Sequence, residues 1–599
     1  MPQPATSPPA NRDLTSMAEA RALAARAKKA GIELAEFDQP RIDAIVDAMA
    51  AAAAAQAEPF ATLAVEETGF GVVADKIQKN LFAAQKVYNF IRPMKTVGVI
   101  ARHEATRVLE IAEPFGVVAA VVPSTNPTST AIYKILIAIK ARCAVVLSPH
   151  PSAVRCITRV AEVMDEAARR AGAPAGAINW MTTVTLEGTQ ELMKQRDVAV
   201  ILATGGMGLV RAAYSAGKPA YGVGPGNAPA YIERSANLKK AVRDIITGKT
   251  FDNGVLCSSE NSVVVDEPVA EEVKREFVAQ NAYFLSRAET EAVARVLITP
   301  QRLPNPALVG RSATVIAEKC GITVPAETRV LIAPLDGVGR DYPLSIEKLC
   351  PVLSYYVVKD WREGCERCKQ ILRYGGMGHT MSIHSQNEQV ILEFGLKKPA
   401  FRIVVNTPTT LGSIGLTTGL DPAMTLGCGG YGGNITSDNI SPRHLINIKR
   451  LAYEITAVAN RFETAGPSAG GGASRLPEAS ARPQPAAGIA AKALTDRIDD
   501  FLGSRGFRGE PHGTGSPTHA EPRDRRATSK ADVADAGADR SSERAADRSA
   551  PLDFVCEEDV RVAIRAGRTL VLAERAIVTP AARDLGEAHH VFSVAPWRG

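Results

Sequence analysis

Short runs of apolar, mostly β-branched residues alternate with longer alanine-rich stretches from residue 16 to about residue 462. The alanine-rich stretches, such as MAEARALAARAKKAG and RIDAIVDAMAAAAAAQ, are typical of helices. The apolar runs are FGVVAAVVP, CAVVLSP, VAVILATGG, NSVVVDE, LSYYVV and FRIVVNT. Because fully buried strands appear as short apolar runs bounded by Gly and Pro, this pattern predicts an α/β fold with parallel strands joined by helical crossovers.

The pattern breaks after Thr464. The segments that follow are rich in Gly, Pro, Ser and charged residues, and we expect linkers there because they offer little apolar surface to bury. Between them, residues 486–503 place apolar side chains on one helical face: Ile489, Leu494, Ile498, Phe501 and Leu502. We expect this short amphipathic helix to dock on a partner, and folding back onto its own chain is the alternative.

The last residues, 551–599, again contain structure-forming patterns. Val560 and Ile564 lie four apart in a predicted helix over 557–566, which Gly567 ends, and TLVL and AIV resemble strands. Thr579 followed by Pro580 predicts a further helix start. This segment is expected to be a small folded module.

Composition limits the possible functions. A net charge of +6 over 599 residues, with no basic patch, gives no reason to expect nucleic acid. The polar start MPQPATSPPANRDL predicts no signal peptide, and no apolar stretch reaches the ~20 residues of a membrane helix. Nine scattered cysteines favour a reducing cytoplasm. Cys365 and Cys368 form a lone CxxC, which we interpret as two helix positions without a metal site.

Cys257 is the first candidate for chemistry. It stands in TFDNGVLCSSENSVVV at the polar edge of an apolar run, after Asn253 and Gly254. A structural cysteine is expected inside such a run, yet free cysteines are commonly core residues. The local sequence therefore leaves open both a nucleophile and a buried small hydrophobe.

A second candidate follows the predicted strand VAVILAT. Thr204, Gly205, Gly206 and Gly208 lead from this strand into a helix, which is how backbone N–H groups and a helix N-terminus meet phosphate. The spacing departs from the regular GxGxxG motif, so this loop alone is weak evidence for a nucleotide site.

Seven segments in a fixed order extend the evidence. They are VVPSTNPTSTAIYK, VVLSPHPSA, GVGPGNAPAYI, GKTFDNGVLCSSENSVVV, EKLCPVLSYY, GGMGHTMSIHS and MTLGCGGYGGNITSDNISPRHLINIKR. Together they resemble the aldehyde dehydrogenase superfamily, in particular its CoA-acylating branch, which includes the aldehyde half of bifunctional aldehyde–alcohol dehydrogenases and acylating sulfoacetaldehyde dehydrogenases. The resemblance covers about three quarters of the chain.

The resemblance implies roles for individual residues. Cys257 would be the nucleophile that attacks the aldehyde, and Asn126, with the Cys257 backbone N–H, would stabilise the oxyanion. The Thr204–Gly208 loop would lie near the pyrophosphate of the nucleotide, and Glu347 would hold the nicotinamide ribose. His379 would lie near the site without an assigned role. Without the resemblance, Asn126 before a proline is an ordinary turn residue and Glu347 an ordinary surface carboxylate.

Two departures from the hydrolytic relatives matter for chemistry. Those relatives carry a glutamate that activates water, whereas the equivalent stretch GVGPGNAP, from Gly222 to Pro229, holds no carboxylate. We therefore expect the thioester on Cys257 to be cleaved by the thiol of coenzyme A. Ser148 stands where hydrolytic members often place a lysine toward the adenosine ribose. NAD is the cofactor that the branch generally favours, and NADP stays open.

The resemblance also implies a division of the chain and an oligomer formed through strand extensions. We expect a doubly wound NAD-binding domain over 16–250, a catalytic α/β domain over 251–425, and a return to the core with an oligomerisation segment over 426–465. The remaining boundaries are those of the tail and termini: a flexible N-terminus 1–15, linkers 466–485 and 504–550, the docking helix 486–503, and the module 551–599.

The tail resembles parts of bacterial microcompartment proteins. TPAARDLGE, in the module, resembles a segment appended to several such enzymes, and 486–503 resembles peptides that attach cargo to shells. We therefore predict a CoA-acylating aldehyde dehydrogenase for a short aldehyde, working in the lumen of a microcompartment with shell or cargo proteins as partners. Acylating oxidation of sulfoacetaldehyde and a non-enzymatic scaffold are the alternatives.

Overall fold

The computed structural model describes residues 11–458 and, with gaps, residues 552–594. The chain divides into two compact units, Met1–Arg482 and Pro483–Gly599. The predicted docking helix 486–503 lies outside the described residues.

Helices form the start of the first unit: α1 (Arg12–Ala35), α2 (Gln39–Ala55), α3 (Ala57–Thr68), α4 (Val73–Leu81) and α5 (Tyr88–Ile91). Helix α1 begins at Arg12, so the prediction of a flexible segment up to residue 15 is wrong for its last residues. The reason is local, because the Asn11 side chain caps the helix by accepting a hydrogen bond from the Asp13 N–H (3.0 Å).

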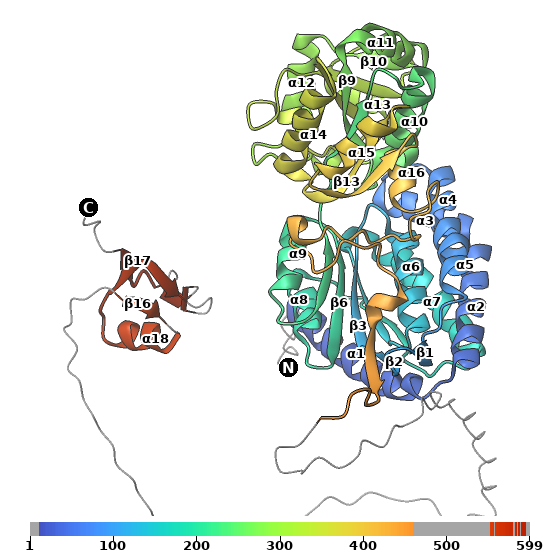
Figure 1. Cartoon of the computed structure of the whole chain (residues 1–599), viewed down its shortest axis with the longest axis vertical. Coiled ribbons are helices and arrows are strands. Elements are labelled where there is room, and N and C mark those ends of the chain that lie inside the picture. The colour runs from blue at the N-terminus through green and yellow to red at the C-terminus, as the bar shows by residue number, and fades with distance from the viewer. Residues whose placement is uncertain are drawn as a thin grey trace, which may run out of the picture. The chain divides into compact units, whose positions relative to one another are not determined.

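A five-stranded parallel sheet with the order β5-β4-β3-β6-β7 forms the centre of the first lobe of this unit (Figure 1). Its strands alternate with helices in the chain: β3 (Val117–Val122), α6 (Pro127–Lys140), β4 (Val145–Pro149), α7 (Val154–Arg170), β5 (Ile178–Trp180), α8 (Leu186–Lys194), β6 (Val198–Thr204), α9 (Met207–Tyr214) and β7 (Ala220–Val223). Three of the predicted strands, β3, β4 and β6, lie side by side here, as expected for a doubly wound fold.

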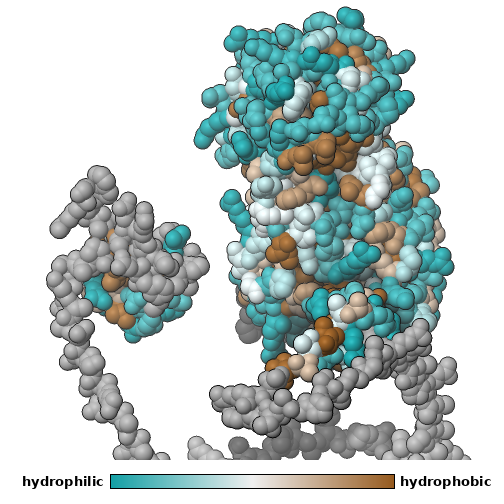
Figure 2. All heavy atoms as spheres, viewed as in Figure 1, coloured by the Kyte–Doolittle hydropathy of each residue, from teal (hydrophilic) through white to brown (hydrophobic). Residues whose placement is uncertain are grey.

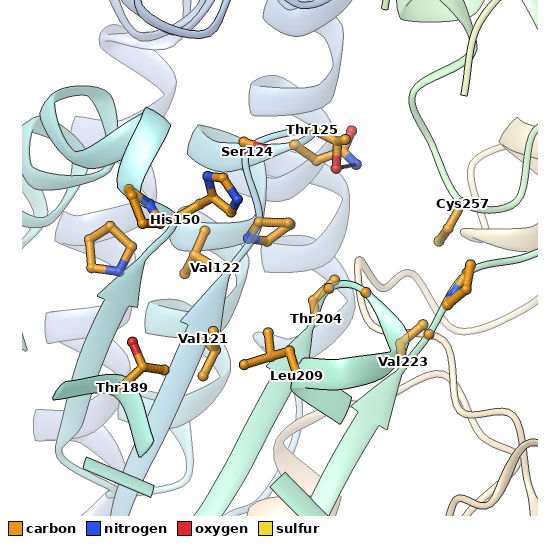
Figure 3. Close-up of a pocket in the computed structure, with 18 of the residues that line it drawn as sticks. Val121, Val122, Ser124, Thr125, His150, Thr189, Thr204, Leu209, Val223 and Cys257 are labelled. Atoms are coloured by element: carbon orange, nitrogen blue, oxygen red, sulfur yellow. Dashed lines mark hydrogen bonds between the residues drawn. The ribbon is translucent and has the colours of Figure 1, made fainter. Parts of the chain in front are cut away.

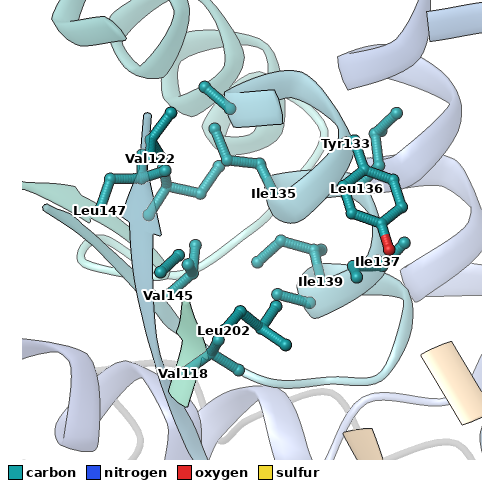
Figure 4. Close-up of a cluster of buried hydrophobic side chains, with 14 of the residues drawn as sticks. Val118, Val122, Tyr133, Ile135, Leu136, Ile137, Ile139, Val145, Leu147 and Leu202 are labelled. Carbon is teal, nitrogen blue, oxygen red and sulfur yellow. The ribbon is translucent and has the colours of Figure 1, made fainter. Parts of the chain in front are cut away.

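Helix α6 is buried along its whole length, and only Lys134 interrupts its apolar sequence between Ala131 and Ile139. Figure 4 shows Ile135 and Ile139 directed toward side chains of β3, β4 and β6, with Leu136 and Tyr133 on the other side of the helix. The hydroxyl of the buried Tyr133 has a hydrogen-bond partner, because its Oη donates to the Ile440 carbonyl (2.6 Å).

A seven-stranded parallel sheet with the order β10-β11-β12-β9-β8-β13-β14 forms the second lobe of the same unit. Its elements are β8 (Ala228–Ile232), α10 (Leu238–Thr250), β9 (Glu260–Asp266), α11 (Ala270–Ala279), β10 (Ala282–Phe284), α12 (Arg287–Leu297), α13 (Ala313–Lys319), β11 (Val330–Pro334), β12 (Val352–Val358), α14 (Trp361–Gly375), β13 (Gly378–His384), α15 (Glu388–Leu396), β14 (Ala400–Val405) and α16 (Thr409–Ser413). The predicted strands β9, β12 and β14 are confirmed, and Cys365 and Cys368 are buried on α14.

Two predicted boundaries are wrong. Strand β8 and helix α10 belong to the seven-stranded sheet and its core, so the change of lobe falls between Val223 and Ala228 and not at residue 250. The return to the first core begins at Ile414 and not at residue 426, because Ile414 and Ala423 already pack in that core. Local periodicity could not place either boundary, since strands of both sheets have the same apolar pattern.

A small antiparallel sheet, β1-β2-β15, extends the first unit. It joins β1 (Gly98–His103) and β2 (Val108–Pro114) to the distant β15 (Ile446–Ala452), with Ile446 opposite Pro114.

The helices of the described residues are all too short or too polar to cross a membrane.

The second unit holds a parallel sheet with the order β16-β17-β18 and one helix: β16 (Leu552–Val555), α18 (Glu557–Arg565), β17 (Leu570–Val578) and β18 (Phe592–Val594). The predicted helix is confirmed, and Gly567 follows it with φ 58°. The two predicted short strands are one strand, β17. The predicted helix start at Thr579 lies outside the described residues.

Candidate active site

A cavity of about 420 Å³ lies at the carboxyl ends of the five-stranded sheet. The strand order reverses between β3 and β6, and the residues that follow these two strands, Pro123–Asn126 and Thr204–Gly206, line the cavity. Ligands of open α/β sheets bind at such a reversal, because the two following loops diverge there and leave a crevice. Figure 3 shows His150 and Thr189 on one side of this space and Cys257 on the opposite side.

The predicted phosphate loop is partly in place. Thr204, Gly205 and Gly206 line the cavity, and the Oγ1 of Thr204 is buried without a hydrogen-bond partner in the described structure. An unsatisfied buried hydroxyl at a cavity points to a ligand. Gly208 does not line the cavity, because it lies in the first turn of α9, where it is exposed to solvent.

Ser148 does not reach the cavity either. It is fully buried in β4, and its hydroxyl shares a hydrogen bond with that of Thr189 (2.8 Å), which itself lines the cavity. His150, two residues later, lines the cavity in its place, and burial lowers the pKa of its imidazole. The structure thus turns Ser148 into the core and His150 toward the cavity, since the direction of a side chain at a strand end depends on the sheet.

Cys257 lines the cavity, and its side chain is half-buried. A turn with left-handed backbone precedes it, with φ of 50° at Asp252, 52° at Asn253 and 73° at Gly254. Burial, together with the negative charge of Glu347, raises the pKa of the Cys257 thiol to about 12. The thiol faces a cavity at a ligand-binding position of the fold, which favours the nucleophile over the buried hydrophobe.

Glu347 also lines the cavity and is otherwise buried. Its Oε1 accepts a hydrogen bond from the Gly226 N–H (2.9 Å), in the segment between the two lobes. Burial raises the pKa of Glu347 to about 8, so the carboxyl is largely protonated near neutral pH. It is the only acidic side chain among the described residues that line the cavity.

His379 lies beside Gly226 and does not line the cavity. A Cβ placed on Gly226 would lie 2.1 Å from the Cys257 carbonyl oxygen and 3.2 Å from the His379 ring, so Gly226 separates the two. The Nδ1 of His379 contacts the Thr380 hydroxyl (2.9 Å), and its Nε2 is buried without a partner in the described structure. Burial, with the nearby Arg402, lowers the pKa of His379 to about 3, so the imidazole is neutral.

Asn126 lines the cavity at the N-terminus of α6. Its Oδ1 accepts a hydrogen bond from the Nζ of Lys79 (2.6 Å), and Lys79 is in turn paired with Asp252. The sequence did not indicate Lys79 or Asp252. Lys79 lies 47 residues before Asn126, and a lysine on a helix is ordinarily a solvated one.

Similarities to known proteins agree with this geometry. A model of the aldehyde dehydrogenase family matches residues 4–292. The bifunctional aldehyde-alcohol dehydrogenase of Escherichia coli K12 is 43% identical over 444 residues, which are 73% of this chain and 50% of that protein. The chain thus spans about half the length of the first curated relatives that it matches.

Solved structures match over their whole length. The crystal structure of an acetylating aldehyde dehydrogenase from Geobacillus thermoglucosidasius is 51% identical, with a TM-score of 0.74 over 76% of this chain and 100% of that one. A propionaldehyde dehydrogenase from the fucose utilisation microcompartment of Clostridium phytofermentans is 27% identical, with a TM-score of 0.65 over 73% of this chain and 97% of that one. This chain therefore belongs to the aldehyde dehydrogenase family.

Proposed function

We propose that this protein oxidises a short aldehyde with NAD⁺ and coenzyme A, giving an acyl-CoA, NADH and a proton. One observation carries the proposal. The Cys257 thiol lines a cavity in which the only acidic side chain among the described residues, Glu347, is buried, protonated near neutral pH and bound to the Gly226 N–H. No lining carboxylate is thus free to deprotonate water, so a thiol is the acceptor of the acyl group.

The residues of the cavity suit each step. The Cys257 thiol releases its proton to solvent as its sulfur attacks the aldehyde carbon, and the Nδ2 of Asn126 and the Cys257 N–H stabilise the oxyanion that forms. Thr204, Gly205 and Gly206 would hold NAD⁺, which would supply the hydride acceptor needed to convert this oxyanion into a thioester on Cys257. The thiol of coenzyme A then attacks this thioester and releases the acyl-CoA and the free cysteine.

The lining of the same cavity suits a nucleotide. Thr204 offers an unsatisfied hydroxyl, Gly205 and Gly206 leave the backbone of the loop accessible, and Glu347 lies near the Cys257 end, where a ribose hydroxyl would meet it. No lysine or arginine is among the described lining residues, although the 2′-phosphate of NADP is usually held by one. NAD is therefore the cofactor that we propose.

The decisive assay measures NADH formation with acetaldehyde, propionaldehyde, lactaldehyde and sulfoacetaldehyde, each with and without coenzyme A, and with NADP in place of NAD. We expect turnover that requires coenzyme A and is lost in Cys257→Ala. Equal turnover without coenzyme A would show that water is the acceptor and would refute the acylating assignment. Absence of turnover with every aldehyde in wild type would favour a scaffold.

We also propose that copies of the chain associate through their sheet edges. Strand β14 ends the seven-stranded sheet and exposes Phe401 and Val405, and the neighbouring α15 exposes Leu392 and Leu396. Figure 2 shows apolar side chains gathered on this part of the surface. An edge strand with exposed apolar residues offers unpaired backbone groups and apolar surface for pairing with another chain. Phe401→Glu is expected to lower the mass measured by light scattering, and an unchanged mass would refute the assignment.

We propose that the protein lies in the lumen of a microcompartment and that residues 486–503 and the module 551–599 direct it there. The support is the sequence resemblance of the tail, the separate hydrophobic core of the second unit, and the microcompartment origin of one similar structure. The test co-expresses shell proteins with the full chain and with a chain ending at Arg482. Protection of only the full chain from external protease is expected, and equal exposure of both would refute the location.

A further inference from the structure

A buried group of charged residues connects the two halves of the candidate oxyanion site. Asp252 is fully buried in the turn before Cys257, and its Oδ2 accepts hydrogen bonds from the Nζ atoms of Lys76 (3.0 Å) and Lys79. Lys79 also donates to the Oδ1 of Asn126 (2.6 Å), and Lys76 to the Thr125 carbonyl (3.3 Å). We call Lys76, Lys79 and Asp252 the lysine–aspartate cluster.

Further hydrogen bonds fix the position of Asp252. Its Oδ1 accepts from the Val72 N–H (2.7 Å), and its own N–H donates to the Oδ2 of Asp75 (2.7 Å). A Cβ on Gly71 would lie 1.9 Å from this carboxylate, so the chain around α4 closes tightly over it. Removing two lysine ammonium groups from water has a large desolvation cost. Apolar side chains of similar size would avoid this cost, so the buried lysines point to a role beyond packing.

The hydrogen bond from Lys79 fixes the orientation of the Asn126 amide. An ammonium group can only donate, so the atom that faces it must be the amide oxygen and the Nδ2 group must point away from Lys79. The Nδ2 contacts the Thr125 hydroxyl (3.2 Å) through one N–H, which leaves the second N–H for a substrate oxygen. A positive charge at the amide oxygen also polarises the amide and strengthens its N–H groups as donors.

We infer that Lys79, held by Asp252, is a positioning residue for aldehyde oxidation that orients and polarises Asn126 as the oxyanion donor. The inference rests on the proposed function, in which Asn126 binds the oxyanion. Asp252 couples the turn that presents Cys257 to the helix that presents Lys79, so nucleophile and oxyanion donor are placed by one set of bonds.

The charges around Lys79 make its effect depend on pH. Burial lowers the pKa of Lys79 to about 7, the carboxylates of Asp252 and Asp75 oppose this shift, and Lys76 adds to it. Above neutral pH Lys79 loses its charge and polarises Asn126 less. The contribution of Lys79 should therefore be larger on the acid side of pH 7 than on the alkaline side.

The test uses thiohemiacetal formation, which requires neither NAD nor coenzyme A. Propionaldehyde is titrated against the rate at which iodoacetamide alkylates Cys257, in wild type, Lys79→Met and Lys79→Gln. We expect the half-protecting aldehyde concentration to rise at least about tenfold in Lys79→Met, since loss of a whole oxyanion donor costs 10²–10³. Alkylation without aldehyde should change little.

Controls separate positioning from folding. Lys140→Met removes another buried lysine, one paired with Asp43 (2.5 Å) away from the cavity, and should lower the melting temperature without changing protection. In Lys79→Gln, which keeps a neutral donor, the defect should be large at pH 6 and small at pH 9. A purely structural role would give the same defect at both.

The outcomes are distinct from those of the turnover assay. At pH 6, folded Lys79→Met or Lys79→Gln protein with wild-type protection overturns the inference, as does the absence of protection in wild type. Weakened protection in these variants, together with turnover that does not require coenzyme A, would refute the acylating function and leave the role of Lys79 standing.

Discussion

Gly226 offers the sharpest test of the geometry around Cys257. In Gly226→Ala the new Cβ would lie 2.1 Å from the Cys257 carbonyl oxygen, whereas such contacts are essentially never below 3.0 Å. The obstacle is backbone, so a rotamer change cannot relieve it, and the Cys257 segment or the Gly226 segment must move by about 1 Å. The move also disturbs the Gly226 N–H bond to Glu347 (2.9 Å).

A displacement of about 1 Å at the reacting group costs about 10²-fold in rate, or about 2.7 kcal/mol of activation free energy. We therefore expect kcat/KM for the CoA-dependent oxidation of aldehyde to fall about 10²-fold in Gly226→Ala. The assay follows NADH, and a melting curve verifies that the variant is folded.

Gly208→Ala is the matched control. Its Cβ would meet no atom within 4 Å, and the residue lies in α9 outside the cavity, so activity should stay at the wild-type level. A helical Gly to Ala change should also raise stability slightly. Folded Gly226→Ala protein with wild-type kcat/KM would refute the close approach of the segment between the lobes to Cys257. An inactive Gly208→Ala variant would indicate that Gly208 contributes to the phosphate site after all.

Other predictions concern three further residues. The folded-state pKa of Glu347, about 8, lies above the ordinary value of 4.5, so its contribution to stability is complete below about pH 4 and is lost as the pH rises through 8. Glu347→Gln should therefore gain unfolding free energy relative to wild type between pH 5 and pH 9 in urea titrations, and a constant difference would contradict the buried neutral carboxyl. His150→Ala should raise the KM for NAD with little change in kcat, because His150 lies across the cavity from Cys257; a lower kcat at unchanged KM would contradict this placement. Tyr133→Phe should cost about 1–3 kcal/mol in chemical unfolding because the buried Ile440 carbonyl loses its donor, and no loss would show that this hydrogen bond contributes nothing.

The sequence by itself determined the fold class and much of the candidate site. Six apolar runs each formed a strand near the predicted position. Five of them are buried on both faces almost throughout, where a strand needs continuous apolar residues whatever its neighbours are, and β14 is an edge strand. Cys257, Asn126, Glu347 and the Thr204 loop line one cavity, although only the ordered motifs related these distant segments to one another.

The tertiary structure decided what depends on direction and on long-range contact. Ser148 turns into the core toward Thr189, while His150 faces the cavity, because the sheet fixes which way a strand-end side chain points. The lobes change at Gly224–Asn227 because strand partners, and not local pattern, assign β8 to the second sheet. Lys79 meets Asn126 and Asp252 across 47 and 173 residues, and such contacts between sequence-distant residues exist only once the chain has folded.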